Sequence, residues 1–330
     1  MNSELLKKTD LLAENKNLIR KGFIWDHYLL HIVAASVFTG KNKTADVDKM
    51  KECRKLLRNK KSILSYFRGN SELFIVSKMA VSADPEKYLD DVVGTYDKLQ
   101  NGKILGSTYR VLAAAIICDA GKAAEADAVV EKTNAIMKGM KASHPFITTD
   151  EDTCLAVLLA MTNKSVDSIL YELEETFKII KKKFPFADNS AYSLSQVITT
   201  YEGTYENKCD KALELYNSLK NIGAKYGWGY ELASLGTLLA VKKNSDDIAA
   251  EVAEVADYLR TKKGFGSFYL TKRNRLMYAA MLVSEVYADD NSTVDASVVG
   301  GSITEVIAQQ IAIFICISSI CASSSYSSSH

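Results

Sequence analysis

Apolar residues gather in seven alanine-rich segments that return along the chain at a loose period of about forty residues. A short polar turn and a second, amphipathic segment follow each of them. This pairing predicts a helical hairpin in which the first helix is buried on nearly all sides and the second keeps one wet face. The seven first segments are residues 29–38, 73–81, 109–118, 155–161, 194–201, 232–240 and 276–283.

The amphipathic segments show the spacing and the boundary residues of α-helices. Within residues 165–183, apolar side chains three or four positions apart form one stripe: Val166, Ile169, Leu173, Phe177 and Ile180. Residues whose oxygens can accept hydrogen bonds from free backbone N–H groups stand where such helices should begin: Asp84 before Pro85, Ser165, and Ser245. We therefore expect helix N-termini at these positions.

These patterns predict an all-α fold, an array of about seven antiparallel helical hairpins with an N-terminal and a C-terminal capping helix. The array could be an open α-solenoid or a closed α/α toroid, and an irregular helical bundle is the alternative. We expect one all-helical repeat domain over residues 1–320 and a flexible, serine-rich tail over 321–330.

Composition limits the class of protein. The 330 residues are 47% hydrophobic and 25% charged, which suits a globular domain, and only three are proline. Six cysteines without short pairings indicate reduced thiols, and the amphipathic, charged start does not resemble a signal peptide, so we expect a cytoplasmic protein. A net charge of +1 does not indicate nucleic acid. Membrane attachment is not expected either, because polar residues interrupt the apolar stretch 303–320.

The near-zero net charge hides a segregation of charge. Windows where a second helix should lead into the next first helix hold lysine and arginine but no acid: 58–71, 98–118, 132–149, 178–187, 217–230 and 260–284. In a stack of antiparallel hairpins these corners lie on one edge, so residues that mark the six corners should lie together: Arg68, Lys103, Lys141, Lys182, Lys225 and Lys263. Helix electrostatics alone predicts the same segregation.

Aromatic residues and glycines stand among these cations, which favours a binding surface for an acidic protein or a phosphate-bearing ligand. The first functional hypothesis is therefore a non-enzymatic interaction scaffold with a basic, aromatic edge. Its candidate binding residues are Lys181, Lys182, Lys183, Lys262, Lys263, Arg273 and Arg275.

The sharpest candidate for chemistry is the stretch "WDHYLLH", where His27 and His31 stand one helical turn apart beside Asp26. Two imidazoles at that spacing could share a metal ion, but a site needs a third ligand, and the stretch lacks the glutamate of zinc proteases. No phosphate-binding loop appears, so no cofactor is expected. The alternative hypothesis is an α/α toroid enzyme of unknown reaction that uses Asp26, His27 and His31 near a central cavity.

The stretch "ENKNLIRKGFIWDHYLLHIVAASVFTG" from residue 14, the segment "STYRVLAAAII" and the apolar, serine-ending tail resemble a Firmicutes family of uncharacterised proteins. That family is classed only as a domain of unknown function, number four thousand and three. The resemblance implies a cytoplasmic bacterial protein without an assigned activity, so it transfers no functional residues to this chain.

Overall fold

The computed structural model describes residues 1–62 and 65–287, and within them the all-α prediction is confirmed. The α-helices are α1 (Ser3–Gly22), α2 (Tyr28–Gly40), α3 (Val47–Lys60), α4 (Glu72–Val81), α5 (Pro85–Gln100), α6 (Thr108–Asp119), α7 (Ala126–Ser143), α8 (Thr153–Ala160), α9 (Val166–Lys183), α10 (Asp188–Thr199), α11 (Tyr205–Asn221), α12 (Ser245–Thr261) and α13 (Lys272–Tyr287). Four 3-10 segments accompany them: η1 (Gly69–Ser71), η2 (Ala123–Glu125), η3 (Asp150–Asp152) and η4 (Tyr230–Ala240).

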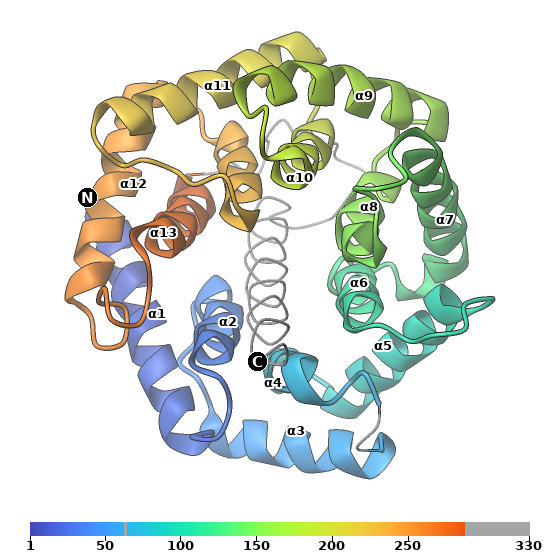
Figure 1. The fold of residues 1–330 in the computed structure, drawn as a ribbon. Helices are drawn as coiled ribbons and strands as arrows, with labels where there is room; N and C mark the ends of the chain where they lie inside the picture. The colour runs from blue at the N-terminus through green and yellow to red at the C-terminus, as the bar shows by residue number, and fades with distance from the viewer. Residues whose placement is uncertain (63–64, 288–330) are drawn as a thin grey trace, which may run out of the picture.

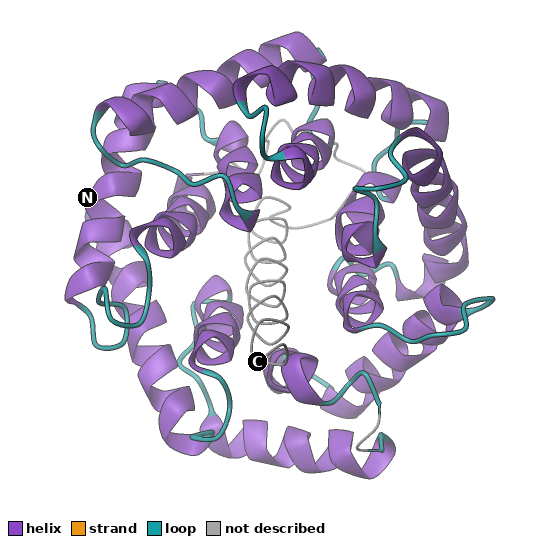
Figure 2. Ribbon diagram, in the orientation of Figure 1, coloured by secondary structure: helices purple, strands orange, loops and turns teal. Residues whose placement is uncertain are grey.

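The helices form two concentric rings (Figure 1). The outer ring holds α1, α3, α5, α7, α9, α11 and α12, and the inner ring holds α2, α4, α6, α8, α10, η4 and α13. The chain passes alternately from an outer to an inner element. Within the inner ring, α2 packs on α4, and α6, α8, α10, η4 and α13 pack on one another in that order. Helix and loop are the only states drawn for the described chain in Figure 2.

Hydrophobicity decides which ring a segment joins. Every residue of α8 is buried, and so are the central residues of α4, α6 and α13, which matches the apolar segments of the sequence. In α9 the buried face is the predicted stripe of Ile169, Leu173, Phe177 and Ile180. An outer helix therefore covers the inner ring with one face and meets solvent with the other.

The predicted helix starts are confirmed to within one residue. The Asp84 carboxylate accepts from the backbone N–H groups of Glu86 and Lys87, with Pro85 at the first helical position. The Ser165 hydroxyl accepts from the N–H of Ser168. At α12 the cap is Asn244 and not Ser245, because the Asn244 side-chain oxygen accepts from the N–H of Asp247.

The element η4 departs from its neighbours because it is wound as a 3-10 helix over eleven residues. Its hydroxyls bond at the matching spacing: Ser234 donates to the carbonyl of Glu231, and Thr237 donates to that of Ser234. A β-carbon at Gly236 would lie 2.5 Å from a methyl group of Val197 on α10, so glycine permits this close approach. The apolar pattern of residues 232–240 predicts a buried helix but not this winding.

The ring closes where α1 packs against α12 and α13, a contact that we call the seam (Figure 1). There Lys262 binds Asp10 of α1 at 2.6 Å, and the Tyr258 hydroxyl donates to the same carboxylate at 2.9 Å. The Lys16 ammonium also donates to the carbonyl of Lys263 at 3.0 Å. The helix predicted as an N-terminal cap is therefore an outer-ring member that joins the two ends of the described chain.

Two sequence predictions concern segments outside the described residues, namely the closing helix over 303–320 and the serine-rich tail over 321–330. Among the helices of residues 1–62 and 65–287, none is long and apolar enough to cross a membrane. Cys53, Cys118, Cys154 and Cys209 are free thiols, and all but Cys118 are buried.

Candidate functional site

The connections from outer to inner elements lie on one side of the ring, the side that faces the viewer in Figures 1 and 2. We call this side the corner face and its connections the corners. They are residues 23–27, 61–71 with residues 63–64 not described, 101–107, 144–152, 184–187, 222–229 and 262–271. All six marker cations lie at these corners or in the helix turns beside them: Arg68, Lys103, Lys141, Lys182, Lys225 and Lys263.

Direct contacts tie successive corners together around the ring. The pairs, in chain order, are Arg54 with Asp26 and Glu72, Gly106 with the Tyr66 ring, Arg110 with Asp150, His144 with Tyr192, Tyr216 with Phe184 and Trp228, Lys272 with the Gly223 carbonyl, and Tyr269 with Tyr28 across the seam. The corners therefore share one surface, which the hairpin pattern of the sequence predicts.

Much of the positive charge at the corners stabilises the fold itself. The guanidinium of Arg110 donates to the carbonyl of Leu105, five residues before it, at 2.6 Å. Arg275 repeats this bond to the carbonyl of Leu270 at 2.6 Å, and it also donates to Phe265. Only 4% of Arg275 is exposed, so its charge belongs to the loop and not to a binding surface. Both arginines satisfy carbonyls that a corner would otherwise leave without partners.

Three of the other candidate binding lysines hold partners within the protein. Lys181 binds Asp188 at 2.8 Å, and Lys183 donates to the side chain of Asn217 at 2.9 Å. Lys262 is the residue that binds Asp10 at the seam. These contacts join the end of one outer helix to a neighbouring element, so these three lysines have a role within the fold.

The remaining candidates are Lys182, Lys263 and Arg273, and all three are exposed. Their charged groups make no ion pair or hydrogen bond with any residue in the described part of the chain. The Arg273 side chain packs beside Gly227. A β-carbon added to Gly227 would lie 2.6 Å from Cδ of Arg273. These three cations are the part of the predicted basic edge that can meet a ligand.

The corner face carries exposed apolar side chains as well as cations. Each corner presents a large apolar residue to solvent: Trp25, Tyr66, Ile104, Phe146, Phe186, Trp228 and Phe268. Phe146 is 95% exposed and Phe186 is 88% exposed. The connections on the opposite side, residues 41–46, 82–84, 120–125, 161–165, 200–204 and 241–244, are all described and present none. The sequence indicated aromatic residues at the corners but not Ile104, whose exposure depends on the fold.

The metal and enzyme hypotheses depend on His27, His31 and Asp26. Each of these side chains contacts a different partner within the protein. His27 caps α2 by accepting from the N–H of Leu29, whereas His31 is buried with Nε2 at 2.8 Å from the carbonyl oxygen of Phe23. The Asp26 carboxylate is bound to Arg54. No group of three metal-ligating side chains occurs among the residues that the structure describes. These side chains do not converge on a common point.

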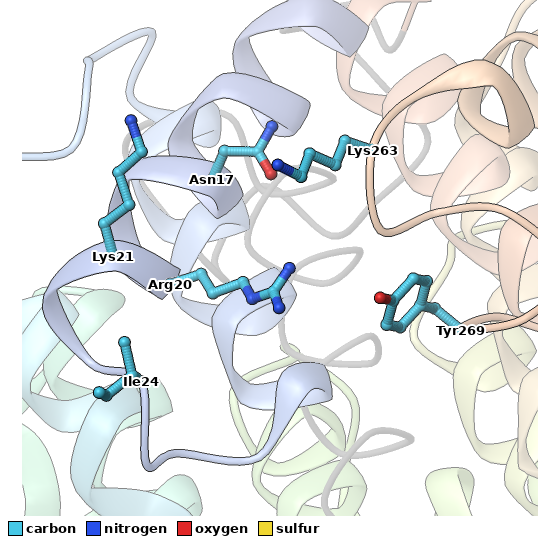
Figure 3. Close-up of a pocket in the computed structure, with 6 residues that line it drawn as sticks. All are labelled: Asn17, Arg20, Lys21, Ile24, Lys263 and Tyr269. Carbon is cyan, nitrogen blue, oxygen red and sulfur yellow. The ribbon is translucent and has the colours of Figure 1, made fainter.

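A pocket of about 520 Å³ opens at the seam and is lined by Asn17, Arg20, Lys21, Ile24, Lys263 and Tyr269 (Figure 3). The Arg20 guanidinium and the Tyr269 hydroxyl point toward each other across it, and the Lys263 ammonium lies beside Asn17. Behind this wall, burial and, to a smaller extent, the charges of Arg20 and Lys263 together lower the pKa of Lys16 to about 8. Sequence analysis missed Arg20 and Lys21, because only ring closure brings α1 next to residues 262–271.

A second pocket of about 320 Å³ lies at the fourth corner, beside Asp150, Glu151 and Asp152. Burial raises the pKa of Asp152 to about 6. Its carboxylate accepts from the N–H of Thr149 at 2.8 Å and from the side-chain amide of Gln196 at 2.7 Å. Asp152 therefore caps the start of η3 and is fixed within the corner.

Comparison with known proteins gives a family but no activity. A model of the protein family described as "Protein of unknown function (DUF4003)" matches residues 15–317. No curated protein and no solved structure match the chain.

Proposed function

Because the chain belongs to DUF4003, a family of proteins of unknown function, its own geometry has to indicate its role, and we propose that it is a non-enzymatic interaction scaffold. In this proposal the corner face binds an acidic protein partner that also carries apolar side chains. The observation that supports it best is the exposed apolar residue at every corner, with none on the opposite connections of the described chain.

Exposing these side chains costs free energy that a partner can recover. Each large apolar residue that is fully buried contributes roughly 1.5–3 kcal/mol, so a few corners suffice for a specific contact. Ile104 is wholly exposed, and Phe146 and Phe186 extend from the next two corners. Aromatic anchors spaced along one face are typical of protein interfaces.

Charge selects the kind of partner. Lys182, Lys263 and Arg273 add exposed, unpaired cations to the same face, as judged from the described residues. An acidic partner would pair with them, and its association should slow as salt screens the charges. The net charge of +1 gives no support for nucleic acid as the partner. We place this function in the cytoplasm, where buried free thiols such as Cys154 stay reduced.

Site-specific photocrosslinking in the source organism tests the proposal. A benzophenone amino acid replaces Phe146 in one variant and Phe186 in a second, and mass spectrometry identifies what is captured. A third variant carries the probe at Tyr171, which is 62% exposed on the outer helix α9 and away from the corners. We expect one acidic protein to be captured from both corner positions and not from Tyr171.

The captured protein is then purified and its affinity is measured by titration. Phe146→Ser combined with Lys182→Glu should weaken binding at least tenfold, and binding should also weaken with added salt. Tyr171→Ser is the matched control. Equal capture from all three positions, a partner without acidic character, or an affinity that the double variant leaves unchanged would each contradict the proposal.

A further inference from the structure

The seam pocket collects cations without a counter-charge. Arg20, Lys21 and Lys263 line it, and the Lys16 ammonium lies just behind its wall. The lining includes no carboxylate, and Asp10, which stands at the same seam, is already bound to Lys262. This differs from the other corners, where Arg110 and Lys181 hold acidic partners.

Holding these cations together costs free energy. Like charges that line one pocket repel each other, and salt only partly screens them. The charged groups of Arg20, Lys21 and Lys263 form no ion pair or hydrogen bond among the described residues, so no acidic side chain of the described fold neutralises them. An anion with two or more charges would relieve the repulsion.

The opposite wall of the pocket is aromatic. Tyr269 is 40% exposed, and its ring meets the edge of the Tyr28 ring at 6.3 Å between centroids. Ile24 adds an apolar side chain on the α1 side of the pocket. A volume of about 520 Å³ suits a small molecule of more than one part.

We propose that the seam pocket binds a small organic phosphate that carries a planar ring, of the size of a nucleoside diphosphate. Its phosphate groups lie against Arg20 and Lys263, and its ring lies against Tyr269. This inference goes beyond the protein-partner proposal, because it assigns a different class of ligand to the seam pocket, whose only residue in common with the partner-binding cations is Lys263. Since the ligand contacts both α1 and residues 262–271, it also holds the ring closed.

Isothermal titration of the full chain at low salt tests this site with ADP, GDP, CDP and UDP in turn. The corresponding nucleosides and inorganic pyrophosphate serve as the two halves of the ligand. We expect at least one nucleoside diphosphate to bind with a dissociation constant below 1 mM, on the order of a weak specific ligand. It should bind at least tenfold more tightly than either half, and it should raise the melting temperature.

Arg20→Ala and Lys263→Ala should each weaken that binding at least tenfold. Neither side chain has a polar partner among the described residues, so both variants should keep the circular dichroism spectrum of the wild type. Lys182→Ala removes an exposed cation far from the seam and should leave the affinity unchanged within twofold. Lys182 also belongs to the corner face that is proposed to bind the protein partner. Lys182→Ala should therefore weaken protein binding without affecting nucleotide binding, which separates the two proposals.

The proposal fails if no nucleoside diphosphate binds below 1 mM. It fails equally if Arg20→Ala binds as well as the wild type, since the site would then lie elsewhere. Pyrophosphate that binds as tightly as the best nucleotide would overturn the assignment of the ring to Tyr269.

Discussion

Lys16→Met is expected to stabilise the protein at neutral pH. Lys16 is 2% exposed, and burial together with the charges of Arg20 and Lys263 lowers the pKa of its ammonium group from 10.5 to about 8. A difference of that size corresponds to about 3 kcal/mol of cost for the charged form in the folded state. Methionine has a similar length and no charge, so it can fill the same space.

The substitution also removes one favourable contact. Lys16 donates to the carbonyl of Lys263, and losing that bond costs about 1 kcal/mol because residue 263 is exposed and water can replace the donor. The net expectation is a gain of about 2 kcal/mol in the free energy of unfolding at pH 7. Lys21→Met, at an exposed position without a partner in the described chain, should change stability by less than about 0.5 kcal/mol.

The pH dependence separates this explanation from better packing by methionine. Between pH 8 and pH 10.5 the unfolded chain holds the Lys16 proton while the folded protein releases it, so wild-type stability gains from this group as pH rises. From pH 7 to pH 9.5 that gain is about 2 kcal/mol, and the variant lacks it. Urea denaturation followed by circular dichroism at both pH values measures the difference. The reasoning would be refuted if Lys16→Met were less stable than the wild type at pH 7. It would also be refuted if the stability difference between variant and wild type were the same at pH 7 and pH 9.5.

Three further predictions concern stability and use the same denaturation assay. Arg275→Met should cost about 2–4 kcal/mol because two carbonyls lose their donor, whereas the exposed Arg273→Met should change little. Gly236→Ala should cost about 1–3 kcal/mol by forcing a methyl group into α10, while Gly94→Ala, within α5 and with open space around it, should stabilise by up to about 1 kcal/mol. Between pH 4 and pH 7 the free energy of unfolding of the wild type should fall by about 2 kcal/mol relative to that of Asp152→Asn. The raised pKa means that the folded protein keeps the Asp152 proton to higher pH than the unfolded chain does. Parallel pH profiles for the wild type and Asp152→Asn would contradict the last of these.

The sequence predicted the secondary structure well because burial and capping are local signals. The stripe through Ile169 and Ile180 and the cap at Ser165 needed only the chain around them. The winding of η4 could not be predicted in this way. The need for glycine at position 236 arises from its close contact with Val197, which lies on another helix. Nor could the period decide between an open and a closed array.

The candidate site was predicted only in part for the same reason. Charge segregation located the corners, but it could not distinguish Lys181, which binds Asp188, from its neighbour Lys182, which has no partner among the described residues. It also could not find Arg20, which becomes a pocket residue only when α1 meets the far end of the described chain. Partners that are distant in sequence decide whether a basic residue supports the fold or can bind a ligand.

The central claim is that the array closes, so that the first and last corners are neighbours on one face. Spin labels on a ketone-bearing amino acid report this by pulsed electron spin resonance, with one label at Ile24 and the second at Phe268 or at Phe146, all exposed. A closed ring predicts a shorter distance from residue 24 to 268 than from 24 to 146. An open array would separate residues 24 and 268 by about six helix-packing steps of about 9 Å, roughly 55 Å, and would reverse that order. The reversed order would contradict the account.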